Sequence, residues 1–462
     1  MNALLRFIGG TPIRLVLSAW LVTIVLFYGL PVRYTDGPRL STLLFLLACL
    51  AGFVYGNAVV RLARANYAAP GRAAPRILSI EPPLRIFAAL GIVGGVLVGI
   101  DKIVLGGLDL SQGLGVLRFA LQSEEEMFKQ RSIALWVGTA LYSFSNIALV
   151  LYLLEGERVR RATAVLVLIS SLSPAFVVLL YGGRSSAIML IFSFVGACLV
   201  RLACGQRLVP KTSIVKLFFI VYCGVVLVGS LYIFTARAET LRGTWAPEVE
   251  ALYAWMDRSG VEVSDELGAF LNTSDASAAL VANLLLAGIY GTHGLSELDY
   301  LLNENADAGP FWGLYQGWMI NKALATAFGV PNVTETFASV IHHTGLFFTA
   351  WGAMLLDFGP WGAPLAFVLF GMLAGWLYVR GVFEGSIVAR IGLTFVYMYI
   401  LISPMDSALS MGNGFLMLTD LGVAAIALTR WSHAHNEPIL STTSSLRPVM
   451  GALVAGPGGS DH

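Results

Sequence analysis

Long apolar stretches recur along the whole chain, and they constrain its fold more than any other feature of the sequence. A helix that crosses the hydrocarbon core of a bilayer needs about 20 mostly apolar residues. Ten stretches meet this requirement: 14–31, 40–60, 86–107, 133–154, 162–182, 186–204, 214–236, 361–379, 386–404 and 412–430. Charged residues make up only 12% of the chain, about half of the share that is typical of soluble domains. The sequence therefore predicts an all-α polytopic membrane protein with about 10–12 transmembrane helices.

The basic residues between these stretches indicate which helix ends face the cytoplasm. Short cytoplasmic loops carry an excess of Arg and Lys. Such residues gather in the loops 61–85, 155–161 and 201–216 and again just after residue 379. If successive helices alternate in direction, these four loops share one side of the membrane with the N-terminus and with the tail from Arg430. We therefore expect both termini in the cytoplasm.

One long segment interrupts the regular alternation of spans and short loops. Residues 237–360 are too many for a connector, and their acidic side chains outnumber the basic ones, which suits the side away from the cytoplasm. Two weaker apolar stretches within it, 277–291 and 338–356, either cross the membrane or lie in its interface. The chain is thus expected to have four parts: N-terminal transmembrane helices 1–236, one large external loop region with interfacial helices 237–360, C-terminal transmembrane helices 361–430, and a disordered cytoplasmic tail 431–462.

The sequence lacks the motifs of several classes of function. It contains neither a nucleotide-binding P-loop nor a metal-ligand spacing, and no basic cluster is dense enough to predict a nucleic-acid partner. The four cysteines all fall in or at the end of apolar runs (Cys49, Cys198, Cys204 and Cys223). They are expected to be small core residues rather than a disulfide framework. We therefore expect no cofactor and no metal.

A permanent charge in the stretch LLYGGRSSAIML, residues 179–190, needs an explanation. Arg184 follows two glycines that permit a tight turn, at the predicted external end of one span and just before the next. It is either a solvated hairpin tip or an anion-binding residue at the membrane surface, and arginine suits phosphate oxygens. Arg237 ends a later span on the same predicted face, followed by Arg242, and either residue is alternatively a snorkelling helix end. Arg184 and Arg237 together are expected to clamp one pyrophosphate.

The stretch GIYGTHGLSELDYLL, residues 288–302, places acid–base side chains at helical spacing. His293 and Glu297 are four residues apart and so share one face of a helix. A histidine oriented by a carboxylate is the usual form of a general base, although a surface ion pair has the same spacing. His342 lies in a second histidine pair further along.

Three other acidic residues are expected to have structural roles or none. Asp357 precedes a Phe-Gly-Pro break, so it is expected to cap the following helix. Asp101 is expected to pair with its neighbour Lys102, and Asp406 and Asn413 carry no clear signal.

These pieces together resemble the O-antigen polymerase family, the Wzy-type oligosaccharide repeat unit polymerases, which are related to the O-antigen ligases. The resemblance is carried by three segments: GGRSS at 182–186, YGTHGLSELDYLL at 290–302, and the run from NVTETF at 332–337 to LLDFGPWGAPLAFVLFGMLAGWLY at 355–378. It is also carried by the order of many spans, a long external loop region and a few closing spans.

The resemblance implies a GT-C-like fold and a metal-independent membrane glycosyltransferase of the bacterial inner membrane. Such an enzyme polymerises undecaprenyl-pyrophosphate-linked oligosaccharide repeat units, which serve as donor and acceptor, together with a chain-length regulator as a partner. Under this reading His293 and Glu297 are the catalytic residues. Arg184, Arg237 and Lys322 bind pyrophosphate, and Tyr290, His342 and Arg242 are further candidates. The alternatives are an O-antigen ligase and a lipid-linked glycan flippase or other transporter.

Overall fold

The computed structural model describes residues 7–35, 37–65, 80–107, 132–181, 185–210, 215–226, 228–229, 247–273, 276–305, 309–330 and 349–434. Within these ranges, nine helices are long and apolar enough to cross a membrane. This confirms an all-α polytopic membrane protein, which associates with the lipid bilayer through its apolar helices. Its described helices are α2 (Pro12–Gly29), α3 (Leu40–Ala65), α4 (Glu81–Gly99), α7 (Ile133–Tyr142), α8 (Phe144–Glu155), α9 (Arg161–Ser170), α10 (Ser173–Tyr181), α11 (Ser185–Ala203), α13 (Pro247–Ser259), α14 (Asp265–Leu271), α15 (Ala276–Thr292), α16 (Gly294–Asn303), α17 (Trp318–Phe328), α19 (Ala350–Tyr378), α20 (Ile387–Ile402) and α21 (Gly412–Ala434).

Eight of the ten predicted spans coincide with these long helices. A ninth, 386–404, is α20, a 16-residue helix that ends at Ile402. The tenth, 214–236, lies partly outside the described residues, and its described part contains the short apolar helix Val215–Val226. The weaker stretch 277–291 belongs to a helical segment, Ser277–Asn303, that is long and apolar enough to span.

The predicted span that begins at residue 361 is the second part of α19, which starts at Ala350 and is interrupted at Gly359. The Thr349 side chain accepts a hydrogen bond from the Gly352 amide, which caps the start of the first part. Gly359 has a positive φ of 71° and a non-helical conformation, so two helical parts meet at a kink at the Phe-Gly-Pro sequence, where the sequence predicts a break.

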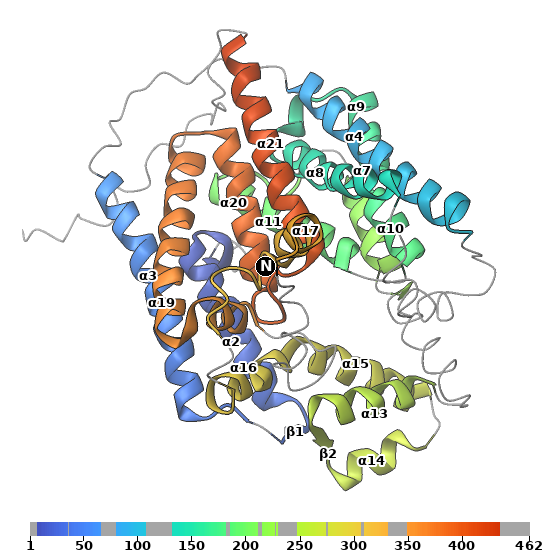
Figure 1. Cartoon of the computed structure of the whole chain (residues 1–462), viewed down its shortest axis with the longest axis vertical. Coiled ribbons are helices and arrows are strands. Elements are labelled where there is room, and N and C mark those ends of the chain that lie inside the picture. The colour runs from blue at the N-terminus through green and yellow to red at the C-terminus, as the bar shows by residue number, and fades with distance from the viewer. Residues whose placement is uncertain are drawn as a thin grey trace, which may run out of the picture.

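Two helices that are far apart in the sequence, α3 and α19, pack together along much of their lengths (Figure 1). Each carries a pair of glycines four residues apart: Gly52 and Gly56 on α3, and Gly371 and Gly375 on α19. A Cβ at Gly52 would lie 2.6 Å from the Pro364 carbonyl oxygen, and one at Gly375 would lie 2.8 Å from that of Asn57. Small residues at this spacing allow two membrane helices to bring their backbones into contact. The first and last parts of the chain therefore form one bundle.

At one end of the bundle the basic loops meet, as the sequence predicts. Arg160 pairs with Glu81 at 3.6 Å, which joins the loops 61–85 and 155–161. Buried Arg201 pairs with Glu157 at 3.0 Å. Buried Arg390 pairs with Glu155 at 2.8 Å, which adds the loop after residue 379. The four loops thus share one end of the bundle, and the assignment of that end to the cytoplasm stays a prediction.

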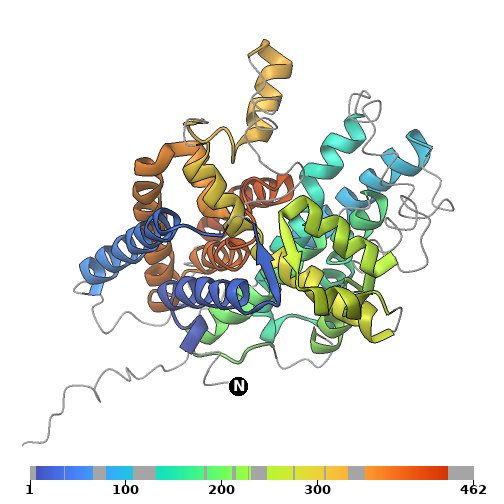
Figure 2. The same ribbon diagram turned by 90° about the horizontal axis from the view of Figure 1, so that it is seen from below.

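The opposite end carries a small helical cap, formed by α13, α14 and α15 (Figures 1 and 2). The cap has its own apolar core, which includes Leu252, Met256, Leu285 and Ile289. Two short strands, which the sequence analysis did not predict, join it to the bundle: β1 (Val32–Tyr34) and β2 (Val261–Val263) pair in antiparallel fashion. Because β1 directly follows α2, the cap lies where α2 ends and α3 begins.

Candidate functional site

The junction between α15 and α16 holds the acid–base pair that the sequence singles out. His293 is 1% exposed, and its ring lies 5.4 Å from that of Trp255 and 5.8 Å from that of Tyr290, between centroids. Its Nδ1 atom lies 3.2 Å from the Ile289 carbonyl oxygen and 3.1 Å from that of Tyr290. A carbonyl oxygen only accepts, so Nδ1 carries the proton and, in the neutral ring, Nε2 carries the basic lone pair. The helix thus fixes the tautomer that a general base requires.

Glu297 lies one turn further along α16 and is equally buried, at 1% exposed. Its amide donates to the His293 carbonyl oxygen at 3.1 Å, so the helical register predicted for the two residues continues across the junction. Gly294, between them, meets two other segments: its Cβ would lie 3.1 Å from the Thr349 amide nitrogen and 3.2 Å from the Pro404 carbonyl oxygen. The start of α16 therefore packs against the start of α19 and against the loop that follows α20.

That loop, residues 403–411, holds a buried carboxylate at the cap end of the bundle. Asp406 is 3% exposed, and its Oδ1 atom accepts hydrogen bonds from the Ser407 amide at 2.6 Å and from the Ser410 hydroxyl at 3.3 Å. Its Oδ2 atom is buried and has no hydrogen-bond partner among the described residues. Burial raises the pKa of Asp406 to about 8, against the opposing effect of these two hydrogen bonds. This carboxyl group can therefore exchange a proton near neutral pH.

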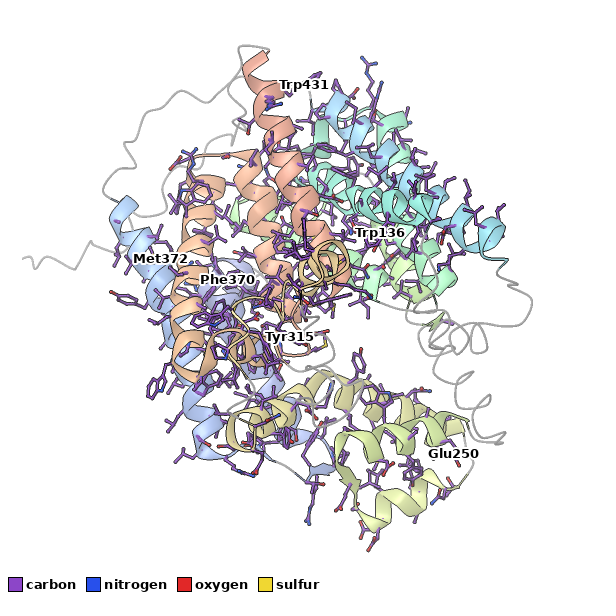
Figure 3. All side chains as sticks on the ribbon, viewed as in Figure 1. Trp136, Glu250, Tyr315, Phe370, Met372 and Trp431 are labelled. Atoms are coloured by element: carbon purple, nitrogen blue, oxygen red, sulfur yellow. The ribbon has the colours of Figure 1, made fainter. Side chains whose placement is uncertain are left out.

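A polar network links Asp406 to a second buried carboxylate, Asp357 on α19. The Ser407 hydroxyl donates to the Gln316 side-chain oxygen at 3.2 Å. Gln316 and its neighbour Tyr315 donate their amides to the two carboxylate oxygens of Asp357, at 3.2 and 2.8 Å. In Figure 3, Tyr315 lies between the cap and the transmembrane helices. The prediction that Asp357 caps the helix after the Gly-Pro break is wrong, because the carboxylate binds the turn at 313–317 instead.

A third polar group lies at the start of α11, directly after the predicted anion-binding arginine. The Asn413 side chain donates to the Ser185 hydroxyl at 2.7 Å, and the Tyr142 hydroxyl donates to the Asn413 side-chain oxygen. The hydroxyls of Tyr142 and Ser186 are 3.3 Å apart. These contacts join α7, α11 and α21 at one point, so the start of α11 is held independently of Arg184.

The structure describes only part of the predicted site. His293, Glu297 and Tyr290 lie together at the junction of α15 and α16, whereas Lys322 lies exposed on α17. The other predicted site residues, Arg184, Arg237, Arg242 and His342, lie outside the described residues. The predicted pair of Asp101 and Lys102 is confirmed, with 3.7 Å between the carboxylate and the ammonium group.

Sequence reasoning missed Asp406, Gln316, Tyr142 and Asn413. One signal was available for Asp406: a carboxylate in the short loop between two strongly apolar helices is costly unless it has a function. The same rule applies to Asp420 on α21, which is 6% exposed. In the described part of the chain, no three His, Cys, Asp or Glu side chains gather in a way that would hold a metal ion.

Comparisons with protein-family models, with curated proteins and with solved structures gave no match for this chain. The class of protein that the sequence and the fold define is thus a polytopic membrane protein.

Replacing Asp406 by Asn is expected to change how stability depends on pH. In the unfolded chain the carboxyl ionises near pH 4, whereas burial keeps it protonated in the folded protein up to about pH 8. Between these values the folded state binds more protons, so the free energy of unfolding falls as pH rises. Asp406→Asn removes this contribution. The difference between the melting temperatures of the variant and the wild type, both measured in detergent, should therefore shift in favour of the variant as pH rises.

The matched control is Asp265→Asn, which changes an exposed carboxyl group at the start of α14. A plot of its melting temperature against pH should run parallel to that of the wild type between about pH 5 and pH 9. A constant difference between Asp406→Asn and the wild type over the same range would contradict the prediction.

Proposed function

We propose that this protein is a glycosyltransferase that polymerises undecaprenyl-pyrophosphate-linked oligosaccharide repeat units into a surface polysaccharide. It would work at the outer face of the bacterial inner membrane, with both termini in the cytoplasm and a chain-length regulator as a partner. The observation that supports this proposal best is the gathering of buried acid–base groups, His293, Glu297 and Asp406, at the cap end of the bundle. That end lies opposite the basic loops. It is therefore external if the loops are cytoplasmic.

The proposed reaction needs a proton acceptor and a stabilised leaving group. A hydroxyl oxygen of the acceptor glycan attacks C1 of the donor sugar, forming the new C–O bond while the bond from C1 to the pyrophosphate oxygen breaks. The electron pair of that bond leaves with the lipid pyrophosphate, and the hydroxyl proton passes to the base. His293 is our first candidate for the base, since its Nδ1 is held as the donor and Nε2 is the basic nitrogen. Arg184, Arg237 and Lys322 would hold the departing pyrophosphate.

Two alternative activities, that of a ligase and that of a flippase, need separate tests. An O-antigen ligase uses the same chemistry with a different acceptor. Two observations favour a flippase for lipid-linked glycans. The first is that Asp420 is buried within a candidate span, since ionisable residues within the membrane often belong to transport pathways. The kink of α19 at Gly359 has the same implication, because transporters often use interrupted helices.

A cell-free reaction separates these functions. Purified protein in vesicles is given an undecaprenyl-pyrophosphate oligosaccharide, and the products are resolved by chain length. A ladder of longer lipid-linked chains is the expected result, and His293→Ala should slow its formation by about 10²–10⁴-fold, the usual contribution of a general base. Movement of the lipid across the vesicle without a ladder would replace the proposal by the flippase. Full activity of His293→Ala alongside a normal ladder would remove only His293 from its role.

A further inference from the structure

The helix α17 is fixed at its first turn to the end of a membrane-spanning helix. The Trp318 indole nitrogen donates to the Ser410 carbonyl oxygen at 2.7 Å. The Met319 sulfur lies 3.2 Å from the position that a Cβ at Gly412 would take, and Gly412 is the first residue of α21. Asn321, three residues after Trp318, is buried as well. The base of α17 therefore lies at the level where α21 begins.

The rest of α17 presents an apolar face that the described residues leave partly exposed. Ile320, Leu324 and Phe328 are 48%, 39% and 76% exposed. Their spacing of four residues places them on one side of the helix. Lys322 lies on the opposite side by the same geometry. A continuous row of large exposed apolar side chains is unusual on a surface that faces water, and it marks a contact with a partner or with lipid.

The direction of α17 differs from that of the spans. Figure 1 shows α17 nearly end-on, whereas α3 and α21 run along the page. Turned by 90°, Figure 2 shows α17 projecting beyond the rest of the molecule. The helix thus leaves the end of α21 sideways, roughly across the direction of the spans.

Two exposed tryptophans lie beside the kink of α19. Trp312 is 74% exposed, and its amide donates to the Asp357 carbonyl oxygen at 2.8 Å, just before the kink of α19. Trp361 is 88% exposed just after that kink. Tryptophan is enriched where the hydrocarbon core meets the headgroups. Below Trp361, the outer face of α19 continues with exposed Leu365 and Leu369, as a lipid-facing span does.

We propose that α17 is an interfacial helix, which lies in the outer leaflet and buries Ile320, Leu324 and Phe328 among lipid chains. Its occupant is the lipid bilayer, because α17 starts beside Gly412, the first residue of the candidate span α21, and because exposed Trp312 lies in the turn just before α17. An amphipathic helix in this position buries its apolar face at the boundary between headgroups and acyl chains. The inference is independent of the proposed function. Its consequence is that the turn at 313–317, which binds Asp357, is held at the membrane surface.

Spin labels on α17 test this placement directly. Phe328→Cys and Lys322→Cys are made in a chain whose four cysteines are replaced by alanine, then labelled and reconstituted in vesicles of phosphatidylcholine and phosphatidylglycerol. The label at 328 should collide severalfold more often with oxygen, which dissolves in lipid, than with a water-soluble nickel complex. The label at 322 should show the reverse preference. A label at 328 that prefers nickel would overturn the proposal. So would a label that neither reagent reaches, because another protein surface, such as a second copy of the chain, would then cover it.

The cysteine replacements carry their own risk, since Cys49, Cys198 and Cys204 are buried. If that background does not fold, the same two positions are compared in the native background with a membrane-impermeant maleimide. Position 322 should react severalfold faster than position 328, with the unsubstituted protein as the baseline for the native cysteines. Equal rates at the two positions would contradict an interfacial α17.

Discussion

The substitution Gly56→Leu is expected to prevent α3 and α19 from packing, and with that to lower stability more than any other single change proposed for this protein. A Cβ at Gly56 would overlap the Val368 carbonyl oxygen of α19. The obstacle is backbone rather than the end of a flexible side chain, so the two helices have to move apart. A shift at this point also separates the neighbouring glycine contacts, because Gly52, Gly371 and Gly375 approach backbone atoms in the same way. Overpacking commonly costs about 1–3 kcal/mol, and we expect the upper end of that range or more.

The purified protein is heated in detergent, and the fraction that stays folded at each temperature is measured by size-exclusion chromatography. Gly422→Leu is the matched control, because Gly422 lies within α21 and nothing is within 4 Å of its Cβ position. The control should melt at the wild-type temperature or slightly above, since Leu favours helix over Gly. If Gly56→Leu and Gly422→Leu melted at the same temperature, the close approach of α3 and α19 would not be important for the bundle.

For α3 and α19, the sequence predicts the two helices but not the contact between them. Apolar length alone predicts both helices, because the requirement to cross a bilayer is local to each segment. Their contact is not local: more than 300 residues separate Gly56 from Gly371. The glycine spacing on each helix is visible in the sequence, but it does not say which of the other helices is the partner. The same limit explains why the pairing of β1 with β2 was not predicted.

The candidate site was predictable to a similar extent. His293 and Glu297 were found because their spacing is helical and α15 and α16 keep that spacing through their junction. Asp406 was missed because its burial depends on segments from elsewhere in the chain, such as the turn at 313–317, which brings Gln316 to the loop that holds Asp406. Asp357 was assigned a local capping role, and its real partners, the amides of Tyr315 and Gln316, come from a segment about 40 residues earlier.

Arg184→Ala is expected to slow the proposed polymerisation by about 10²–10³-fold, the usual loss when one group that stabilises a developing anion is removed. As lipid pyrophosphate departs, its charge grows, so an arginine that contacts it acts mainly in the transition state. The effect should therefore appear in kcat rather than in KM alone. Arg184→Lys should recover part of the rate, because lysine keeps the charge but loses the two-pronged contact of the guanidinium group. The ladder assay with purified lipid-linked oligosaccharide measures both variants.

The Arg184 variants are expected to stay folded, so a lower rate would reflect the lost side chain rather than unfolding. The start of α11 is held by Asn413 and Tyr142 through Ser185 and Ser186, so removing the side chain at 184 leaves these contacts in place. Melting temperatures close to that of the wild type are therefore expected for both variants. Arg33→Ala removes an exposed arginine from β1, beside the cap, and should keep the wild-type rate. If Arg184→Ala and Arg33→Ala both retained more than half of the wild-type rate, Arg184 would not contact the pyrophosphate. Other residues would then have to stabilise the leaving group.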